Sequence, residues 1–517
     1  MSVATEIQSI TARQFETPAK FTQFCENGGQ PLGGYINGEH ISGAMNASID
    51  TVDPGSLEVL ARVCEMGQEQ VDAAAEAAHR AFLGNGVSGW RDFPMEERCE
   101  LMMKLVELCE RDRDVLLACE IRDGGKLSEL AEGDFDQIRA TAEYFCSIAP
   151  QLILGDSGHR AVAADTQGFT YREPWGVVAG IIPWNYPIVL TSWFMFPALL
   201  AGNCILIKPA EDTPLSALYI AKLAEEAGCP PGVINVLPGR GELTGQFIAE
   251  NPLVRYISFT GSPGVGQHIL RTCDRHGTRM KREMGGNGSA IVLDDADPAI
   301  VARKIGRHTN QHFGQTCCTI HRIFVDQKIA DDFIDAQRDF FSGLKIGYQA
   351  DAGTQLGAVI NATQRSRILT AQQQATARGG QSLVEGGPAE VAGKEGYYVR
   401  PALYQTQPDL ACNPDEVFHC FATICPVSSA DQALQLANSS PYGLGASVWT
   451  KDTQRGIALA KQFRDGTAQV NCHNMIAYGL PYSGQGISGG PGAGVNCEET
   501  LTDYTQVKAV YVADYPG

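Results

Sequence analysis

Residues 176–209 read GVVAGIIPWNYPIVLTSWFMFPALLAGNCILIKP, with Lys208 as the only charged residue. A run of this length could cross a membrane if it formed one continuous helix. Three prolines and two asparagines interrupt it between residues 177 and 207, however, and proline ends or kinks a helix. The pattern therefore predicts a buried strand at 177–182, a loop, a buried helix at 188–201 and a second buried strand at 204–207.

The alternation of strands and helices continues downstream of this run. A helix is expected after Thr213-Pro214, strands at 233–237 and 256–259, and helices at 241–250 and 264–271. Four short apolar strands separated by helices predict an α/β fold with a doubly wound parallel sheet, whose ligands bind at the carboxyl ends of the strands. A second series of strands, at 290–293, 322–325 and 447–450, predicts a second α/β domain.

The flanking regions carry simpler signals. Residues 35–39 predict a hairpin that turns at Asn37-Gly38. Helices are expected at 68–82 and 94–118, with Pro94 at the first helical position of the second one. Residues 502–512 alternate as a β-strand does and end the chain.

Composition narrows the class of protein. The 517 residues allow roughly three domains. The 40 basic and 59 acidic side chains give a net charge of −19, which disfavours binding to nucleic acid or to an anionic membrane. The 16 cysteines include no C-x-x-C pair, so we expect reduced thiols and no metal site. Because residues 1–30 show no secretory signal, we expect a cytoplasmic protein.

Two residues could carry covalent and acid–base chemistry. Cys317 lies in GQTCC, between a predicted helix and a predicted strand, where an accessible thiol of lowered pKa could act as a nucleophile. Glu283 lies in EMGGNG, where two glycines can hold the carboxylate at a tight bend close to a ligand. Taken alone, a buried structural thiol and a surface carboxylate are the better explanations of these two residues.

Three further segments could bind a nucleotide or stabilise negative charge. Gly261 and Ser262 lie between a strand and a helix, where backbone N–H groups can bind phosphate. Lys208 and Glu211 follow a strand at the place where a ribose would lie. Asn185, held between two prolines, could donate to an oxyanion. A surface ion pair and a rigid connecting loop are the simpler explanations of the last two segments.

These five segments, in this order, resemble the large NAD(P)-dependent aldehyde dehydrogenase superfamily. The resemblance extends from about residue 35 to residue 512 and includes the segments PPGVINVLPG (230–239), EVF (416–418), YGL (442–444), VN (470–471) and YTQVK (504–508). The spacing of 34 positions from Glu283 to Cys317 also matches the spacing of base and nucleophile in that family.

The resemblance implies a hydrolytic mechanism. Cys317 would attack the aldehyde, Asn185 and the Cys317 N–H would hold the oxyanion, and Glu283 would activate the water that hydrolyses the thioester. The cofactor contacts it implies are Trp184, Lys208, Glu211, Gly261, Ser262, Glu416 and Phe418. A carboxylate at Glu211 would accept hydrogen bonds from the adenosine ribose and repel a 2′-phosphate, which favours NAD over NADP.

The resemblance also implies that the chain has three structural parts and forms a homo-oligomer. A Rossmann-like cofactor domain would comprise residues 1–150 and 174–282, and an α/β catalytic domain residues 283–495. A small bridging β-sheet, from 151–173 and 496–517, would mediate a homodimer or homotetramer.

By position, six residues are expected to line the substrate pocket: Tyr186, Leu190, Trp193, Thr316, Cys318 and Tyr482. An apolar tunnel of this kind suits aliphatic or aromatic aldehydes. The sequence also shows some resemblance to the betaine-aldehyde and amino-aldehyde subgroup. A partial aromatic box that binds a cationic aldehyde therefore remains an alternative.

The sequence departs from the family pattern beside the expected site. Asn287 replaces the usual lysine after the two glycines, and His419-Cys420 replace the glycine and proline that follow Phe418. Gly484-Gln485-Gly486 is not followed by the usual lysine, and the usual Arg-Glu pair is missing from 489–494. Two alternatives therefore remain: a CoA-acylating semialdehyde dehydrogenase, against which Glu283 argues, and a non-catalytic binding or structural relative.

Overall fold

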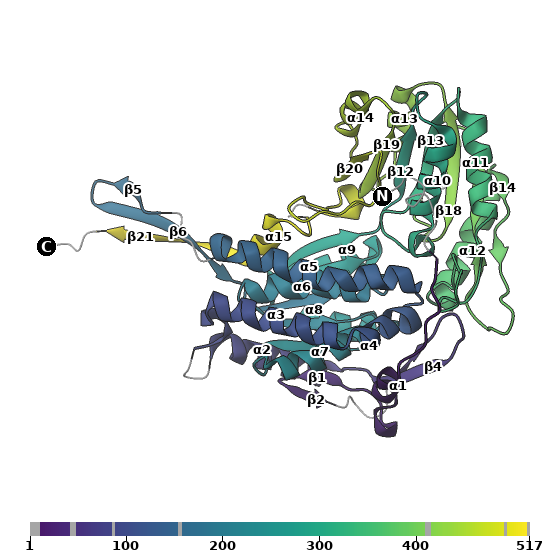
Figure 1. Cartoon of the computed structure of the whole chain (residues 1–517). Helices are drawn as coiled ribbons and strands as arrows, with labels where there is room; N and C mark the ends of the chain where they lie inside the picture. The colour runs from purple at the N-terminus through teal and green to yellow at the C-terminus, as the bar shows by residue number, and fades with distance from the viewer. Residues whose placement is uncertain are drawn as a thin grey trace.

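The computed structural model describes residues 11–41, 48–84, 88–153, 158–408, 415–490 and 494–513. Two helix-covered sheets lie side by side, and a narrow three-stranded sheet extends from one of them (Figure 1). The predicted α/β fold class is confirmed, with parallel pairing dominant in both large sheets.

The first large sheet contains the strands predicted around residues 176–209. Its order is β11-β10-β7-β8-β9-β1-β2, parallel from β11 to β9 and antiparallel beyond. The strands are β1 (Gly34–Ile36), β2 (Glu39–Ile41), β7 (Val177–Ile181), β8 (Cys204–Lys208), β9 (Ile234–Val236), β10 (Val254–Gly261) and β11 (Arg279–Met284). The hairpin at Asn37-Gly38 is confirmed, and both turn residues have positive φ, as the tight turn between twisted strands requires.

Helices bury both faces of this sheet. The helix between the two buried strands is α6 (Pro187–Leu200), which confirms the strand–helix–strand prediction for 176–209. The other helices of this half are α1 (Ala19–Glu26), α2 (Gln68–Leu83), α3 (Met95–Arg111), α4 (Arg113–Ala118), α5 (Ser128–Ile153), α7 (Leu215–Ala227), α8 (Gln246–Glu250), α9 (Pro263–His276) and α15 (Glu498–Asp503). Their apolar faces and the sheet form one continuous core.

Three predicted elements differ in detail. The helix expected at 94–118 is broken at Asp112, whose carboxylate accepts hydrogen bonds from Lys20 and from the Tyr219 hydroxyl. Pro94 precedes that helix in an extended conformation instead of occupying its first turn. Residues 241–245 form a π-helical turn before α8, and residues 502–503 belong to α15 and not to the terminal strand.

The second large sheet has the order β14-β17-β18-β13-β12-β19-β20 and is parallel except for β14. Its strands are β12 (Gly288–Val292), β13 (Ile320–Asp326), β14 (Gln381–Val384), β17 (Ala402–Gln405), β18 (Phe421–Val427), β19 (Gly445–Trp449) and β20 (Thr467–Val470). The helices around it are α10 (Pro298–Thr309), α11 (Ala330–Ser342), α12 (Ala362–Ala377), α13 (Ala430–Ala437) and α14 (Thr453–Ala460). Ala12, near the start of the described chain, packs in the core of this second half.

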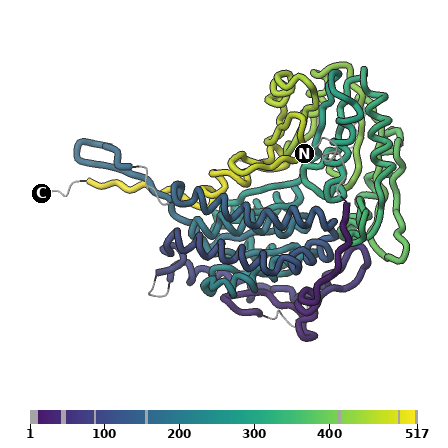
Figure 2. The backbone as a smooth tube through the Cα atoms, in the orientation of Figure 1, coloured from purple at the N-terminus to yellow at the C-terminus, as the bar shows by residue number. Residues whose placement is uncertain are grey.

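The three-stranded sheet extends away from the first half of the molecule (Figure 2). It contains β5 (Arg160–Ala163), β6 (Thr166–Pro174) and β21 (Thr505–Ala513), with β6 in the centre. Four large apolar side chains on its strands are 50–67% exposed: Val162, Val507, Tyr511 and Val512. We refer to this sheet as the arm.

Two short two-stranded pairs complete the described fold: β3 (Ser48–Val52) with β4 (Val59–Cys64), and β15 (Gly387–Pro388) with β16 (Val399–Arg400). Among the described residues, no helix has the length and apolarity needed to cross a membrane. The fifteen cysteines in that part of the chain are all free thiols.

Candidate active site

Cys317 lies in the loop that joins a short 3-10 turn (Gln311–Gly314) to β13. Hydrogen bonds fix this loop: the Thr319 hydroxyl donates to the carbonyls of Gly314 and Thr316, and His473 Nε2 donates to the Cys318 carbonyl at 2.6 Å. Gly314 has φ of 78°, and a β-carbon there would lie 2.1 Å from the carbonyl carbon of His419. The backbone before the thiol is therefore held in one position.

The surroundings of Cys317 favour the thiolate. Hydrogen bonding from the Cys318 thiol lowers the pKa of Cys317, and the Tyr482 hydroxyl, 3.3 Å from Sγ, acts in the same direction against the effect of burial. The pKa of Cys318 is raised well above its ordinary value by the same contact and by burial. Cys318 Sγ also lies 2.8 Å from Asn474 Oδ1, so its single S–H can donate either to this oxygen or to Cys317. Cys317 is thus the better nucleophile of the two.

Glu283 lies on β11, where its backbone pairs with Thr260 of β10, so it occupies a strand and not the tight bend expected from the sequence. Burial raises the pKa of Glu283 to about 8, the charge of Cys317 adds to that shift, and Lys281 opposes it. Its Oε2 atom is buried and finds no hydrogen-bond donor in the described part of the chain. An unpartnered carboxyl with a pKa near neutrality suits a general base.

Asn185 is buried in the loop after β7, and its Nδ2 donates to the Gln315 carbonyl at 3.0 Å. This bond ties the loop to the Cys317 loop, two residues before the thiol. The amide nitrogen has a second proton, so it can still donate to a substrate oxygen. Asn185 therefore lies against the loop that carries Cys317.

The expected cofactor residues lie at the carboxyl ends of β8 and β10. Lys208 ends β8 with its side chain buried, and Nζ donates to the Pro209 carbonyl and lies 3.5 Å from Glu211 Oε2. Burial lowers the pKa of Lys208, and Glu211 opposes that shift. Gly261 ends β10, and Ser262 precedes α9 without its side chain capping the helix. The first turn of α9 thus offers free N–H groups to an anion.

Glu416 and Phe418 approach from the second half of the molecule. Glu416 Oε1 accepts a hydrogen bond from the Gly286 N–H at 3.0 Å, and burial raises the pKa of Glu416 to about 8. A β-carbon on Gly285 would lie 2.1 Å from Glu416 Oε2, so a side chain at this position would push the carboxyl away. Phe418, at φ of 59°, contacts Trp184 edge to face at 5.4 Å.

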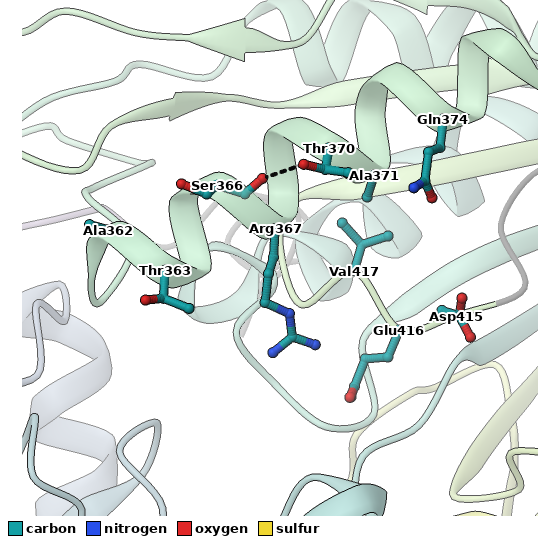
Figure 3. A pocket seen from close by; sticks show the side chains of 10 residues that line it. All are labelled: Ala362, Thr363, Ser366, Arg367, Thr370, Ala371, Gln374, Asp415, Glu416 and Val417. Carbon is teal, nitrogen blue, oxygen red and sulfur yellow. Dashed lines mark hydrogen bonds between the residues drawn. The ribbon is translucent and has the colours of Figure 1, made fainter.

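A cavity of about 570 Å³ opens beside Glu416, between α12 and residues 415–417. Figure 3 shows Arg367 of α12 pointing into the same space as Glu416. Carboxylate and guanidinium groups side by side can bind the hydroxyls and the phosphates of a nucleotide. Nothing in the sequence around Arg367 predicts a binding role, because a single arginine in a helix rich in polar residues has no distinguishing pattern.

The six expected pocket residues are distributed over two neighbouring groups. Tyr186, Leu190 and Trp193 are half-buried against the first core, on α6 and the loop before it. Cys318 and Tyr482 pack together beside Cys317. Thr316 connects the groups, since its hydroxyl lies 2.9 Å from the Tyr186 hydroxyl.

A buried group of charges lies beneath Tyr186. Lys126 Nζ lies 4.4 Å from the centre of the Tyr186 ring and donates to Glu120 at 2.6 Å and to Asp134. Burial raises the pKa of Asp134 to about 6. Glu120 also accepts from the Ile188 N–H at the start of α6, so this charge group positions the helix that carries Leu190 and Trp193.

The departures from the family pattern are accommodated within the fold. The Asn287 carbonyl accepts two hydrogen bonds from the Arg322 guanidinium, and its Nδ2 lies 3.4 Å from the Asp415 carbonyl. His419 is fully buried, which lowers its pKa to about 3 and keeps the ring neutral. Cys420 is fully buried beside it. These residues support the loops around Cys317 and Glu416.

Residues 40–510 match the model of the aldehyde dehydrogenase family. An aldehyde dehydrogenase of Agaricus bisporus is 34% identical over 98% of both chains, and human aldehyde dehydrogenase 1A1 is 35% identical over 92% of this chain and 94% of its own.

Solved structures agree with these relatives. The NAD+ complex of a Bacillus cereus aldehyde dehydrogenase is 31% identical, with a TM-score of 0.90 over 97% of this chain and 100% of that one. A Staphylococcus aureus betaine aldehyde dehydrogenase in complex with NAD+ is 29% identical, with a TM-score of 0.90 over 96% of this chain and 98% of that one. With the family match over nearly its whole length, the chain belongs to the aldehyde dehydrogenase family.

Proposed function

We propose that this chain oxidises an aldehyde to a carboxylic acid and uses NAD as the hydride acceptor. The observation that carries the proposal is that two interacting side chains, Cys317 and Glu283, have pKa values shifted in opposite directions. Cys317 has a lowered pKa, and Glu283, which interacts with it, has a raised one. A nucleophile and a base tuned toward neutral pH are what acyl transfer followed by hydrolysis needs.

The proposed residues act in sequence. The Cys317 thiolate attacks the carbonyl carbon, and the C–S bond forms while the carbonyl oxygen gains the negative charge. Asn185 Nδ2 and the Cys317 N–H donate to that oxygen. NAD would supply the hydride acceptor, and loss of the hydride from the carbon bound to Cys317 would leave a thioester on that residue. Glu283 then removes a proton from water as the water attacks the thioester, and Cys317 leaves as the thiolate.

The residues proposed to hold NAD fit a dinucleotide. Lys208 and Glu211 would bind the adenosine ribose, and Gly261, Ser262 and the first turn of α9 would bind phosphate. Glu416 would bind the second ribose, with Phe418 and Trp184 beside it, and Arg367 supplies a cation at the neighbouring cavity. The half-exposed carboxylate of Glu211 would repel a 2′-phosphate, which favours NAD over NADP.

For the substrate, we propose an uncharged aliphatic or aromatic aldehyde. The ring of Tyr186 already has a cation, Lys126, at one face, and the remaining pocket residues are mostly apolar or aromatic. The Tyr186 ring would attract a cation on the substrate less strongly, because it already interacts with Lys126. The competing candidate, a quaternary-ammonium or amino aldehyde, needs Trp193 and Tyr482 to supply the attraction.

The decisive experiment measures NADH formation by the purified, reduced protein. NAD or NADP is supplied with aliphatic, aromatic, amino and quaternary-ammonium aldehydes, and Cys317→Ala is run in parallel. NAD-dependent turnover that requires Cys317 and proceeds without CoA supports the proposal. Turnover that requires CoA would indicate the acylating alternative. No turnover with any aldehyde, despite NAD binding, would indicate a non-catalytic relative.

We further propose three parts, with residues 1–150 and 174–282 binding the cofactor, 283–495 carrying the nucleophile, and 151–173 with 496–517 bridging subunits. The arm supports a homodimer or homotetramer, because its exposed apolar side chains suit burial against a second copy of the chain. The free thiols support a reducing compartment, for which we propose the cytoplasm.

A further inference from the structure

A buried lysine accompanies Glu283 on β11. Lys281 lies two residues before Glu283, and its side chain is only 6% exposed. Side chains two residues apart in a strand point to the same face of the sheet. A buried ammonium group is costly unless it is paired or hydrogen-bonded, so its position calls for an explanation.

The C-terminal segment anchors this ammonium. Lys281 Nζ donates to the Gly494 carbonyl at 3.0 Å. The same carbonyl accepts from the Thr500 hydroxyl at 2.6 Å and from Cys497 Sγ at 3.4 Å. Gly494 lies in the segment 489–494, where the sequence departs from the family pattern.

Arg282 lies on the other face of β11 and does not contribute to the pKa shift of Glu283. Met284 points toward α9, since a β-carbon on Gly266 would lie 2.5 Å from its sulfur. The charged residues of α9 are all exposed: His268, Arg271, Asp274, Arg275 and His276. Cys273 is the buried titratable residue of that helix.

The inner face carries the groups that act on Glu283. Cys317 and Lys281 interact with its charge, and Tyr256 of β10 is affected by it. Asp503 and Cys497 act on Lys281 from the α15 region, and Asp503 also pairs with Arg279 at 3.7 Å. Burial lowers the pKa of Lys281, Glu283 and Asp503 oppose that shift, and Lys281 in turn favours the ionised form of Glu283.

We propose that Lys281 is a positioning residue for thioester hydrolysis: its anchored ammonium keeps part of the Glu283 population ionised near neutral pH. The inference rests on the proposed role of Glu283 as the base. The direction agrees with the electrostatics, because burial raises the pKa of Glu283 to about 8 and Lys281 opposes that rise. Without the cation, the pKa would rise further and less of the base would be available.

The test isolates hydrolysis from hydride transfer. An activated ester, p-nitrophenyl acetate, acetylates Cys317 without any cofactor, and intact-protein mass spectrometry then follows deacetylation from about pH 6 to about pH 10. In Lys281→Met, we expect the rising limb of the deacetylation rate to move up by about one pH unit. The rate near pH 7.5 then falls about tenfold and is regained at high pH. Lys281→Arg, which keeps the charge, should retain the wild-type profile.

Two comparisons keep the outcomes distinct. If Glu283→Gln deacetylates as fast as the wild type, the proposed base is wrong and the inference falls with it. If Glu283→Gln is slow but Lys281→Met keeps the wild-type pH profile, the inference about Lys281 alone is overturned. Lys281→Gln is a second neutral variant should Met not fold. The acetylated fraction reports folded sites, and a merely structural role would lower that fraction without moving the limb.

Discussion

The Tyr482 hydroxyl lies 3.3 Å from Cys317 Sγ, close enough to share a proton with the thiolate. Tyr482→Phe keeps the ring and removes this bond, so we expect the pKa of Cys317 to rise. The alkylation of Cys317 by iodoacetamide near pH 7 should slow about tenfold, because only the thiolate reacts. Peptide mass mapping measures the rate across pH. Tyr511→Phe on the exposed arm is the control, and identical pH profiles for both variants would refute the role of Tyr482.

Glu283 predicts how hydrolysis depends on pH. With a pKa of about 8, the carboxyl is mostly protonated at pH 7, so deacylation should accelerate until pH passes about 8 and then level off. Glu283→Gln should slow deacylation by about 10²–10⁴-fold and remove this dependence. Stopped-flow measurement of NADH should still show a burst in the variant. A variant that loses the burst as well would place Glu283 in the acylation step.

The same shift predicts a stability difference. The folded state holds its Glu283 proton up to about pH 8, whereas the unfolded state releases it near the ordinary value of 4.5. The folded state binds more protons between these values, so Glu283 makes the protein less stable as pH rises through that window. Glu283→Gln should therefore gain stability relative to the wild type between pH 5 and pH 9, as urea denaturation at each pH would show. A constant difference across pH would contradict the raised pKa.

Glu211 should set the choice of cofactor. Its carboxylate lies 3.5 Å from Lys208 Nζ and is 41% exposed at the end of β8. Glu211→Gln removes the charge that would repel a 2′-phosphate, so we expect the preference for NAD over NADP to fall about tenfold, mainly through KM for NADP. Glu242→Gln, a surface change in the same half of the molecule, is the matched control. An unchanged NADP/NAD ratio of kcat/KM would assign selectivity to another residue.

The buried charges beneath Tyr186 should matter for stability. Lys126→Met leaves Glu120 and Asp134 buried without their cation, which costs about 3–5 kcal/mol. Urea denaturation measures the loss. Lys508→Met, which breaks an exposed pair with Glu173, should leave the unfolding midpoint unchanged. Equal stability of the two variants would show that the buried charges are compensated elsewhere.

The arm should control assembly. Val162→Lys together with Tyr511→Glu places charges on two of its exposed apolar positions. We expect the chain to run at a smaller mass in size-exclusion chromatography with light scattering, because burying these charges at an interface is unfavourable. Val265→Lys, at an exposed apolar residue of α9, tests whether any new surface charge has the same effect. A mass unchanged from the wild type would rule out the arm as the interface.

Much of the fold could be predicted from periodicity, because buried parallel strands such as 204–207 are short, continuous and apolar. The sequence pattern does not predict strand β11, because four of the six residues in RMKREM are charged and the segment resembles an exposed one. The break at Asp112 was missed because it depends on Tyr219, 107 residues away. Cys317, Glu283 and Asn185 came from motifs, whereas Lys281, Arg367 and Asn474 have roles that only tertiary contacts reveal.

The glycine three residues before the nucleophile has a practical meaning for protein engineering. A β-carbon at Gly314 would lie within 2.1 Å of the His419 backbone, and backbone cannot rotate aside as a side chain can. In a randomised library that includes position 314, clones with any residue other than glycine there would therefore be inactive. Leu190 and Trp193, which are half-buried side chains of α6, are the better places to begin when a different aldehyde is to be accepted.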